Sequence, residues 1–243
     1  MKISVRNSYE APVNGADITV FFDIFRASTT LVTLASKHPD IIVSSNHLPT
    51  IRNYQESGYR LLSEVYTGDF DNSPTQVMSE SWQGRKVIHS STNLTNSIFG
   101  NRDFHHGLIG CFHNIEALTD YIVSRRPQHV ELIACSHFAR RTVAIEDMSC
   151  AMLCRSRLLA LLAVSVSDSG LQPSLSLMGT PNIPDQEGIR AKIADKEASA
   201  TYPAYRINDL RYCMELKAVP VVLEIQPRSH HVMEIASVRR EPA

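Results

Sequence analysis

Acidic side chains recur where apolar segments of this 243-residue chain give way to polar loops. Asp23 follows an apolar run directly, Glu64 follows Leu62 and Ser63, and Asp69 and Asp71 stand in the loop beyond Glu64. Carboxylate oxygens suit Mg²⁺, which usually takes one or two protein carboxylates together with waters and substrate phosphate oxygens. The pattern therefore indicates a site for Mg²⁺ and a phosphorylated compound.

A cation and a run of hydroxyl groups come soon after Asp23. Arg26 precedes Ser28, Thr29 and Thr30, which stand in the first turn of an expected helix. A helix start can hold an anion, because its backbone N–H groups are free and the positive end of its dipole points there. Arg26 could grip phosphate through two parallel hydrogen bonds. The alternative is an ordinary helix cap, in which the hydroxyls only satisfy the helix start.

Other polar clusters also follow predicted strands. They are Asn72 with Ser73, then Ser91, Thr92, Asn93 and Thr95, then Ser136 with His137, and finally Glu146 with Asp147. Ligands of open α/β sheets bind outside the carboxyl ends of the strands, so the joint occurrence favours one site. Each cluster alone has a structural explanation. Asn72 and Ser73 precede a proline as in a turn and helix cap, and Glu146 and Asp147 favour a helix dipole without any metal.

The elements that position these residues alternate between short apolar runs and helix-like stretches of about ten residues, which is typical of βαβ units. Strands are expected at residues 2–6, 18–22, 40–45, 60–63, 86–90, 106–111 and 130–135. Helices are expected from residue 26, at 49–56 and 74–82, from 91, and at 114–125 and 145–164. The predicted fold class is α/β, a layered α-β-α sandwich around a mostly parallel sheet, built as one body or as two similar lobes.

The last third of the chain has a different pattern. Residues 165–184 contain Ser, Pro and Gly and are expected to form a linker or long loop. Beyond them we expect helices near 186–200 and 207–217 and strands at 219–225 and 232–238, paired as a hairpin or returned to the main sheet. The predicted division is an α/β domain over residues 1–164, carrying most of the site, and a C-terminal α/β portion over 165–243 packed against it.

Composition excludes several classes of protein. The chain is 43% hydrophobic and 20% charged, which is ordinary for a soluble globular protein. A net charge of −1 gives no support to a role on nucleic acid or at a membrane surface. No apolar stretch is long enough to span a bilayer, and the N-terminus has no secretory apolar region. Five cysteines without zinc-site spacing indicate reduced thiols and a cytoplasmic location.

Five stretches carry a resemblance to a known family. They are DIFRASTT at 23–30, LSE at 62–64, GDFDNSP at 68–74, STNLT at 91–95 and AIED at 144–147. Together with DLRYCMEL at 209–216, they resemble the 2-phosphosulfolactate phosphatase family, enzymes of coenzyme M biosynthesis. The resemblance covers most of the chain.

The resemblance implies an α/β fold of two similar α-β layers and Mg²⁺-dependent removal of phosphate from a small acidic phosphomonoester. It implies that metal is held by Asp23, Glu64, Glu146 and Asp147, and that catalysis involves Asp23, Arg26, Glu64 and Asp147. The substrate's oxygens would be held by Arg26, Ser28, Thr29, Asn72, Ser73, Thr92 and Asn93. Either a carboxylate orients the attacking water, or Asp23 attacks and forms an aspartyl-phosphate.

Three departures from the family pattern affect the loops. Val65 stands where an arginine is expected, and Leu94 stands where a glycine is expected. The loop at 135–141 contains no glycine. We expect Leu94 to crowd a close backbone approach, since only glycine reaches positive φ easily. Loops carry specificity, so a related chemistry on a changed substrate is expected.

The leading hypothesis is a cytoplasmic Mg²⁺-dependent phosphatase that acts on a small phosphorylated carboxylate, with no nucleic-acid or membrane partner. A homodimer is compatible with the sequence. One alternative is a lyase or transferase that uses the same phosphate site, and another is a non-catalytic relative that binds an anion or a partner. The proton donor to the leaving group stays open among His89, His105, His106, His113 and His137.

Overall fold

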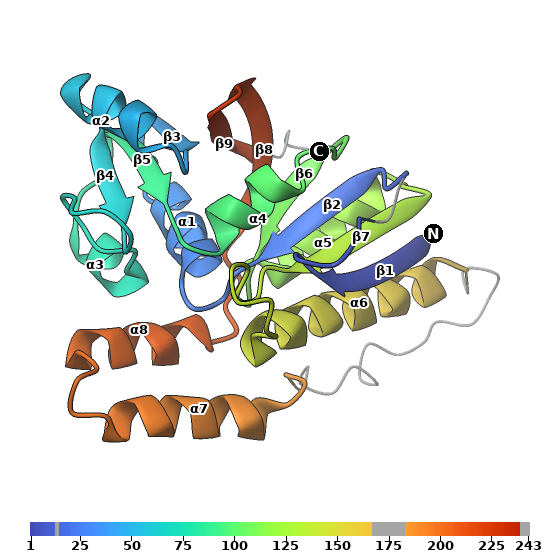
Figure 1. The fold of residues 1–243 in the computed structure, drawn as a ribbon. Coiled ribbons are helices and arrows are strands. Elements are labelled where there is room, and N and C mark those ends of the chain that lie inside the picture. The colour runs from blue at the N-terminus through green and yellow to red at the C-terminus, as the bar shows by residue number, and fades with distance from the viewer. Residues whose placement is uncertain (13–14, 167–182, 239–243) are drawn as a thin grey trace.

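A computed structural model describes residues 1–12, 15–166 and 183–238 (Figure 1). In chain order the elements are β1 (Lys2–Asn7), β2 (Ile18–Phe22), α1 (Ala27–Ala35), β3 (Ile41–Ser44), α2 (Leu48–Glu56), β4 (Arg60–Ser63), α3 (Pro74–Ser79), β5 (Lys86–Ser90), α4 (Leu94–Gly100), β6 (Gly107–Gly110), α5 (Ile115–Ser124), β7 (His129–Ala134), α6 (Ile145–Val166), α7 (Gln186–Ala198), α8 (Ala204–Cys213), β8 (Val222–Ser229) and β9 (Val232–Val238). The α/β alternation is confirmed. Most of the linker expected at residues 165–184 lies outside the described residues.

The described strands form one nine-stranded sheet in the order β1-β7-β2-β6-β8-β9-β3-β5-β4. Parallel pairs join β1, β7, β2 and β6 on one side and β3, β5 and β4 on the other. Between these groups lies the antiparallel hairpin β8–β9, which pairs with β6 and with β3. Both arrangements left open by the sequence are therefore realised, because the two last strands form a hairpin and also lie within the main sheet.

The hairpin reverses the direction of the sheet. Three successive pairs, β6–β8, β8–β9 and β9–β3, are antiparallel, so the group β3-β5-β4 runs opposite to the group β1-β7-β2-β6. Figure 1 shows β3, β4 and β5 with α2 and α3 on one side of the hairpin, and β1, β2 and β7 with α6 on the other. A site that collects strand ends from both groups therefore cannot lie along one sheet edge, as the sequence suggested. It must form where the two groups meet.

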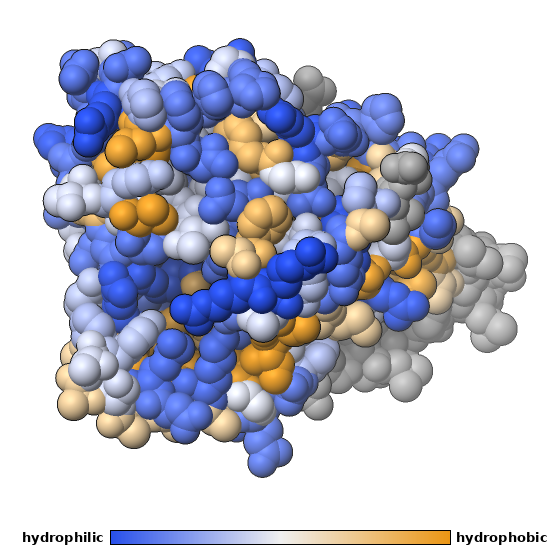
Figure 2. Space-filling view, viewed as in Figure 1, coloured by the Kyte–Doolittle hydropathy of each residue, from blue (hydrophilic) through white to orange (hydrophobic). Residues whose placement is uncertain are grey.

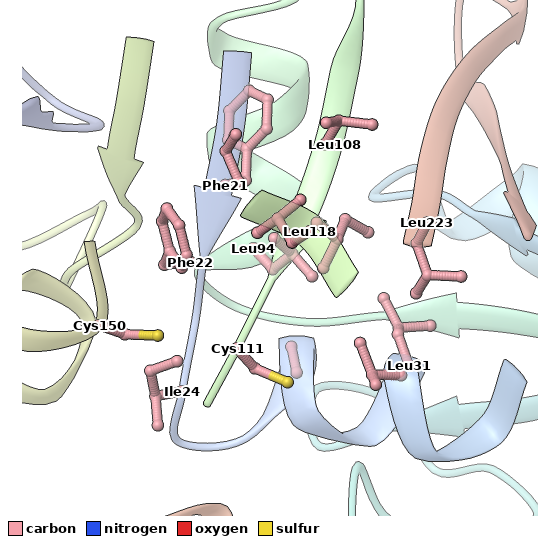
Figure 3. Packing of buried hydrophobic residues seen from close by; sticks show 14 of the residues in the cluster. Phe21, Phe22, Ile24, Leu31, Leu94, Leu108, Cys111, Leu118, Cys150 and Leu223 are labelled. Atoms are coloured by element: carbon pink, nitrogen blue, oxygen red, sulfur yellow. The ribbon is translucent and has the colours of Figure 1, made fainter. Parts of the chain in front are cut away.

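Helices cover both faces of the strand that leads to Asp23. α4 and α6 each contact β2, and every residue of Ile18–Phe22 is buried. Successive side chains of a strand point to opposite faces, which explains why Phe21 and Phe22 are both fully enclosed. Figure 3 shows Phe21 and Phe22 with Leu108 and Leu118 in this core. The packing fixes the end of β2, where the expected site begins.

The helices and the visible face of the molecule bear on whether the chain spans a membrane. None of the described helices is long and apolar enough to cross a bilayer. Figure 2 shows hydrophilic side chains over most of the visible face, with apolar ones scattered among them.

Candidate active site

A cavity of about 300 Å³ opens where the segments after β2, β4 and β5 meet the loop between β7 and α6. It is lined by Asp23, Phe25, Arg26, Glu64, Asn72, Thr92, Asn93, His137, Ala139 and Arg140. Six of these residues were expected from the sequence: Asp23, Arg26, Glu64, Asn72, Thr92 and Asn93. The structure thus brings together strand ends from both parallel groups.

Asp23 lies at the cavity wall with only 4% of its surface exposed. The Leu94 N–H, at the start of α4, donates to its Oδ2 (2.8 Å), so the carboxylate joins the end of β2 to the segment after β5. Burial, then the negative charges of Glu64 and Glu146, raise the pKa of Asp23 to about 7. The carboxylate therefore lies near the midpoint of its titration at neutral pH.

Glu64 lines the same cavity, and only one of its two carboxylate oxygens accepts hydrogen bonds. Its Oε1 accepts hydrogen bonds from the Thr92 N–H (2.7 Å) and the Thr92 hydroxyl (3.1 Å). Its Oε2 is buried and has no hydrogen-bond partner among the described residues, and the same holds for Oδ1 of Asn72. Buried acceptors are normally satisfied, so two unpaired oxygens in one cavity wall point to a missing donor or cation.

Arg26 has two carboxylate partners. It donates to Oδ2 of Asp209 (2.6 Å) and to both oxygens of Asp71 (3.1 and 3.2 Å). The sequence indicated that Arg26 could clamp a phosphate, and the structure shows that its charge is balanced within the protein. Asp209 was part of the family resemblance, but no local pattern connected it with Arg26.

Three hydroxyl residues expected to bind substrate lie in the interior, outside the cavity wall. Ser28 accepts a hydrogen bond from the Asp23 N–H (2.8 Å), and the Thr29 hydroxyl donates to the Ile24 carbonyl (3.4 Å). Ser73 donates to Oδ1 of Asp209 (2.7 Å) and caps α3. All three are fully buried. These contacts match the alternative interpretation of the sequence, in which the hydroxyls serve the local structure and do not bind a ligand.

Glu146 and Asp147 also lie off the cavity wall. The Asp147 carboxylate accepts from the backbone N–H of Ile24 (2.7 Å) and of Ser136 (2.8 Å). Both oxygens of Glu146 accept from the Lys192 ammonium (2.7 and 2.8 Å). Burial, then the charges of Asp23 and Glu146, raise the pKa of Asp147 well above its ordinary value.

The four carboxylates expected to hold a metal are divided between the cavity wall and the interior. Among the described residues, no group of three or more His, Cys, Asp or Glu side chains is arranged to hold a metal ion. Asp23 and Glu64 line the cavity, whereas Asp147 ties together the loops after β2 and β7. The prediction of a metal now rests on the two carboxylates at the cavity and on the unpaired Asn72 oxygen.

Leu94 does not crowd the cavity, contrary to expectation. It is the first residue of α4, lies outside the residues with positive φ, and buries its side chain completely in the core (Figure 3). Its backbone N–H remains free to reach Asp23. The side chain points away from the backbone approach that glycine was expected to permit.

The loop between β7 and α6 supplies Ala139 and Arg140, which the sequence did not single out, and His137, which it named as a possible proton donor. Ser136 and Arg141 adopt φ angles of 56° and 53°, which glycine adopts more easily. The backbone is therefore left-handed at these two positions although neither residue is glycine. No residue pattern within the loop indicated which side chains would face the cavity.

Of the five histidines considered as proton donors, only His137 is among the described residues that line the cavity. Burial lowers its pKa, as do the positive charges of Lys192 and Arg140. Its imidazole is consequently neutral near pH 7 and can accept a proton there.

Comparisons with known proteins agree with one another. A family model described as 2-phosphosulpholactate phosphatase matches residues 6–228. A probable 2-phosphosulfolactate phosphatase from Synechococcus sp. (strain WH7803) is 27% identical over 174 residues, covering 68% of this chain and 70% of that protein. A protein of the same description from Trichormus variabilis is 22% identical over 224 residues, covering 85% and 87%. One from Thermoplasma volcanium is 29% identical over 87 residues, covering 33% and 41%.

Proposed function

The chain belongs to the 2-phosphosulpholactate phosphatase family, and from this premise we propose that it hydrolyses the phosphate ester of a small phosphorylated carboxylate with bound Mg²⁺. Relatives that are 27% and 22% identical are described as probable 2-phosphosulfolactate phosphatases, which supports this class of reaction. The changed loops around the cavity favour a substrate other than phosphosulfolactate.

The observation that carries the proposal is the unpaired Oε2 of Glu64 in the cavity that Asp23 also lines. A phosphate dianion would be repelled by two carboxylates unless a cation lay between them. Mg²⁺ commonly binds through one or two carboxylates, with waters and substrate phosphate completing its shell. Asp23, Glu64 and the Asn72 carbonyl are the oxygen donors that would hold it.

When bound at such a site, Mg²⁺ neutralises charge that builds up on a transferring phosphoryl group. The chain's own residues supply the rest. The hydroxyl of Thr92 and the amides of Asn72 and Asn93 bind and orient the phosphoryl oxygens, and Arg26, held in place by Asp209, borders the same space. Positioning of this kind provides much of the catalysis in phosphoryl transfer.

Asp23 is the carboxylate that contacts the reacting group. It either attacks phosphorus itself or orients the attacking water. His137, which also lines the cavity and is neutral near pH 7, accepts a proton from the attacking water. Acid quenching of a single turnover with ³²P-labelled ester separates the two routes, since only attack by Asp23 leaves label on the protein.

The test is phosphate release from a panel of small phosphomonoesters, with Mg²⁺ and with EDTA. We expect release that requires the metal and that falls at least about a thousandfold in Asp23→Asn. Asp120→Asn, on α5, is the matched control for a change of charge away from the cavity. Phosphate release that lacks ¹⁸O from labelled water would instead indicate a lyase or transferase. A folded protein that binds neither Mg²⁺ nor phosphate would indicate the non-catalytic alternative.

A further inference from the structure

Arg140 is an exposed residue that lines the cavity, and no carboxylate of the described residues forms an ion pair with it. The other cations near the site differ in this respect. Arg26 is balanced by Asp71 and Asp209, and Lys192 is paired with Glu146. Arg140 is therefore the cavity-lining cation whose charge remains available to a ligand.

The backbone that carries Arg140 is held firmly. The Arg140 N–H donates to the His137 carbonyl (3.1 Å), and the His137 N–H donates to the Thr142 carbonyl (2.9 Å), which closes the loop on itself. The Phe138 N–H donates to Oδ1 of Asn93 (3.3 Å), so the loop is tied to the segment that bears Thr92. A tethered arginine loses less freedom on binding a ligand than one on a mobile loop.

The neighbouring Arg141 points elsewhere. Its guanidinium donates to the Tyr9 carbonyl (3.2 Å) and lies 5.9 Å from the centre of the Tyr9 ring. It does not line the cavity among the described residues. Figure 2 shows strongly hydrophilic side chains over the middle of the visible face, where Figure 1 draws the loop between β7 and α6. Two adjacent arginines thus differ in one respect that matters, since only Arg140 faces the cavity.

The remaining cavity charges indicate what Arg140 would bind. Asp23 and Glu64 are acidic, and the residues proposed to hold the phosphoryl group, Thr92 and Asn72, come from the segments after β5 and β4. The loop with Arg140 closes the cavity from another part of the chain. A guanidinium binds a carboxylate through two parallel hydrogen bonds, and this geometry distinguishes it from a neutral group of the same size.

We propose that Arg140 binds the carboxylate of the substrate and so determines the preference of this chain for phosphomonoesters that carry a second anionic group. The proposal rests on the proposed phosphatase function, which it makes more specific. It assigns Arg140 a role in specificity, without a part in the cleavage of the ester.

The test compares two esters of similar size, 2-phosphoglycolate, which carries a carboxylate, and ethyl phosphate, which carries a methyl group there. With Arg140→Ala, kcat/KM for 2-phosphoglycolate should fall about 10- to 100-fold, mainly through KM, because a hydrogen-bonded charge pair is lost. For ethyl phosphate, kcat/KM should change by less than about threefold, because this ester has no carboxylate for Arg140 to bind. Arg141→Ala is the matched control and should change neither ester, and Arg140→Lys should retain part of the preference.

Equal losses on both esters would overturn the proposal by placing Arg140 at the phosphoryl group, and unchanged values on both would show that it contacts neither. Calorimetric binding of 2-phosphoglycolate in the presence of Mg²⁺ separates this proposal from the proposed function. A wild-type protein that hydrolyses no ester of the panel, yet binds 2-phosphoglycolate and loses that affinity in Arg140→Ala, would support the role of Arg140 and overturn the proposed hydrolysis. A wild-type protein that binds neither compound would overturn the proposal.

Discussion

The guanidinium of Arg26 donates a 2.6 Å hydrogen bond to the carboxylate of Asp209, 183 positions further along the chain. Asp209 is fully buried, and its other oxygen accepts from the hydroxyls of Ser73 and Thr75. One carboxylate on α8 therefore fixes both the loop after β2 and the start of α3. The C-terminal part of the chain contributes to the site in this way, although none of its described residues lines the cavity.

Asp209→Ala should lower the free energy of unfolding by about 3–5 kcal/mol, because it leaves buried charge and hydroxyl groups without their partner. Urea denaturation at neutral pH measures the change. Asp195→Ala, an exposed carboxylate on α7, is the control and should change stability by less than about 0.5 kcal/mol. A loss below about 1 kcal/mol in Asp209→Ala would contradict the structural role assigned to this contact.

Glu64→Gln should raise the Mg²⁺ concentration needed for half-maximal activity at least about tenfold, because it removes a charged oxygen from the proposed site. Titration of activity against Mg²⁺ measures this, and calorimetry repeats it without substrate. Glu187→Gln, exposed on α7, should leave the titration unchanged. An unaltered half-saturation in Glu64→Gln would count against metal binding at this carboxylate.

Because the pKa of Asp23 is raised, the contribution of this carboxyl to the free energy of unfolding should fall as the pH rises. The pKa rises from 3.8 to about 7 on folding, so between pH 4 and 7 the folded chain binds more protons than the unfolded one. This carboxyl therefore stabilises the fold fully below pH 4, and its contribution, up to about 4 kcal/mol, is lost as the pH rises to 7. Burial lowers the pKa of His89 to about 3, which acts in the opposite direction.

The difference in the free energy of unfolding between wild type and Asp23→Asn isolates the effect of Asp23, because His89 is present in both proteins. In EDTA, the variant should gain stability relative to wild type as the pH rises from 4 to 8, and urea denaturation at four pH values measures it. A difference that is independent of pH would contradict the raised pKa.

Lys192→Ala should lower the free energy of unfolding by about 3 kcal/mol, because Glu146 is 2% exposed and would lose its cation. Lys196→Ala, one turn further along α7, is the matched control, since none of the described carboxylates forms an ion pair with it. Thermal unfolding at pH 7 compares the two variants. Equal effects would show that Glu146 does not depend on Lys192.

The alternation of strands and helices could be predicted because it depends on local periodicity, and the structure confirms it. The direction of the second group of strands could not. It depends on the pairing of β9 with β3, between residues almost 200 positions apart, such as Val43 and Glu234. Local patterns contain no information on such pairings, so the two possible uses of the last strands could not be separated in advance.

The carboxylates at strand ends were the most predictable part of the site, since Asp23 and Glu64 line the cavity as expected. Ser28 and Ser73 were expected to bind substrate, but both make hydrogen bonds inside the protein. A hydroxyl near a helix start suits either role, and only the folded chain shows which role it has. Arg140 was missed because no periodicity applies within a loop. The Mg²⁺ requirement, the homodimer and the cytoplasmic location remain predictions.

The position of the β8–β9 hairpin in the sheet has a consequence for synthesis on the ribosome. The edges of β6 and β3 find their partners only when residues 222–238 have left the exit tunnel. Until then a nascent chain exposes two unpaired strand edges, which are templates for association with other chains. A chain cut after α8 should therefore aggregate, whereas in a chain that includes β8 and β9 both edges are paired.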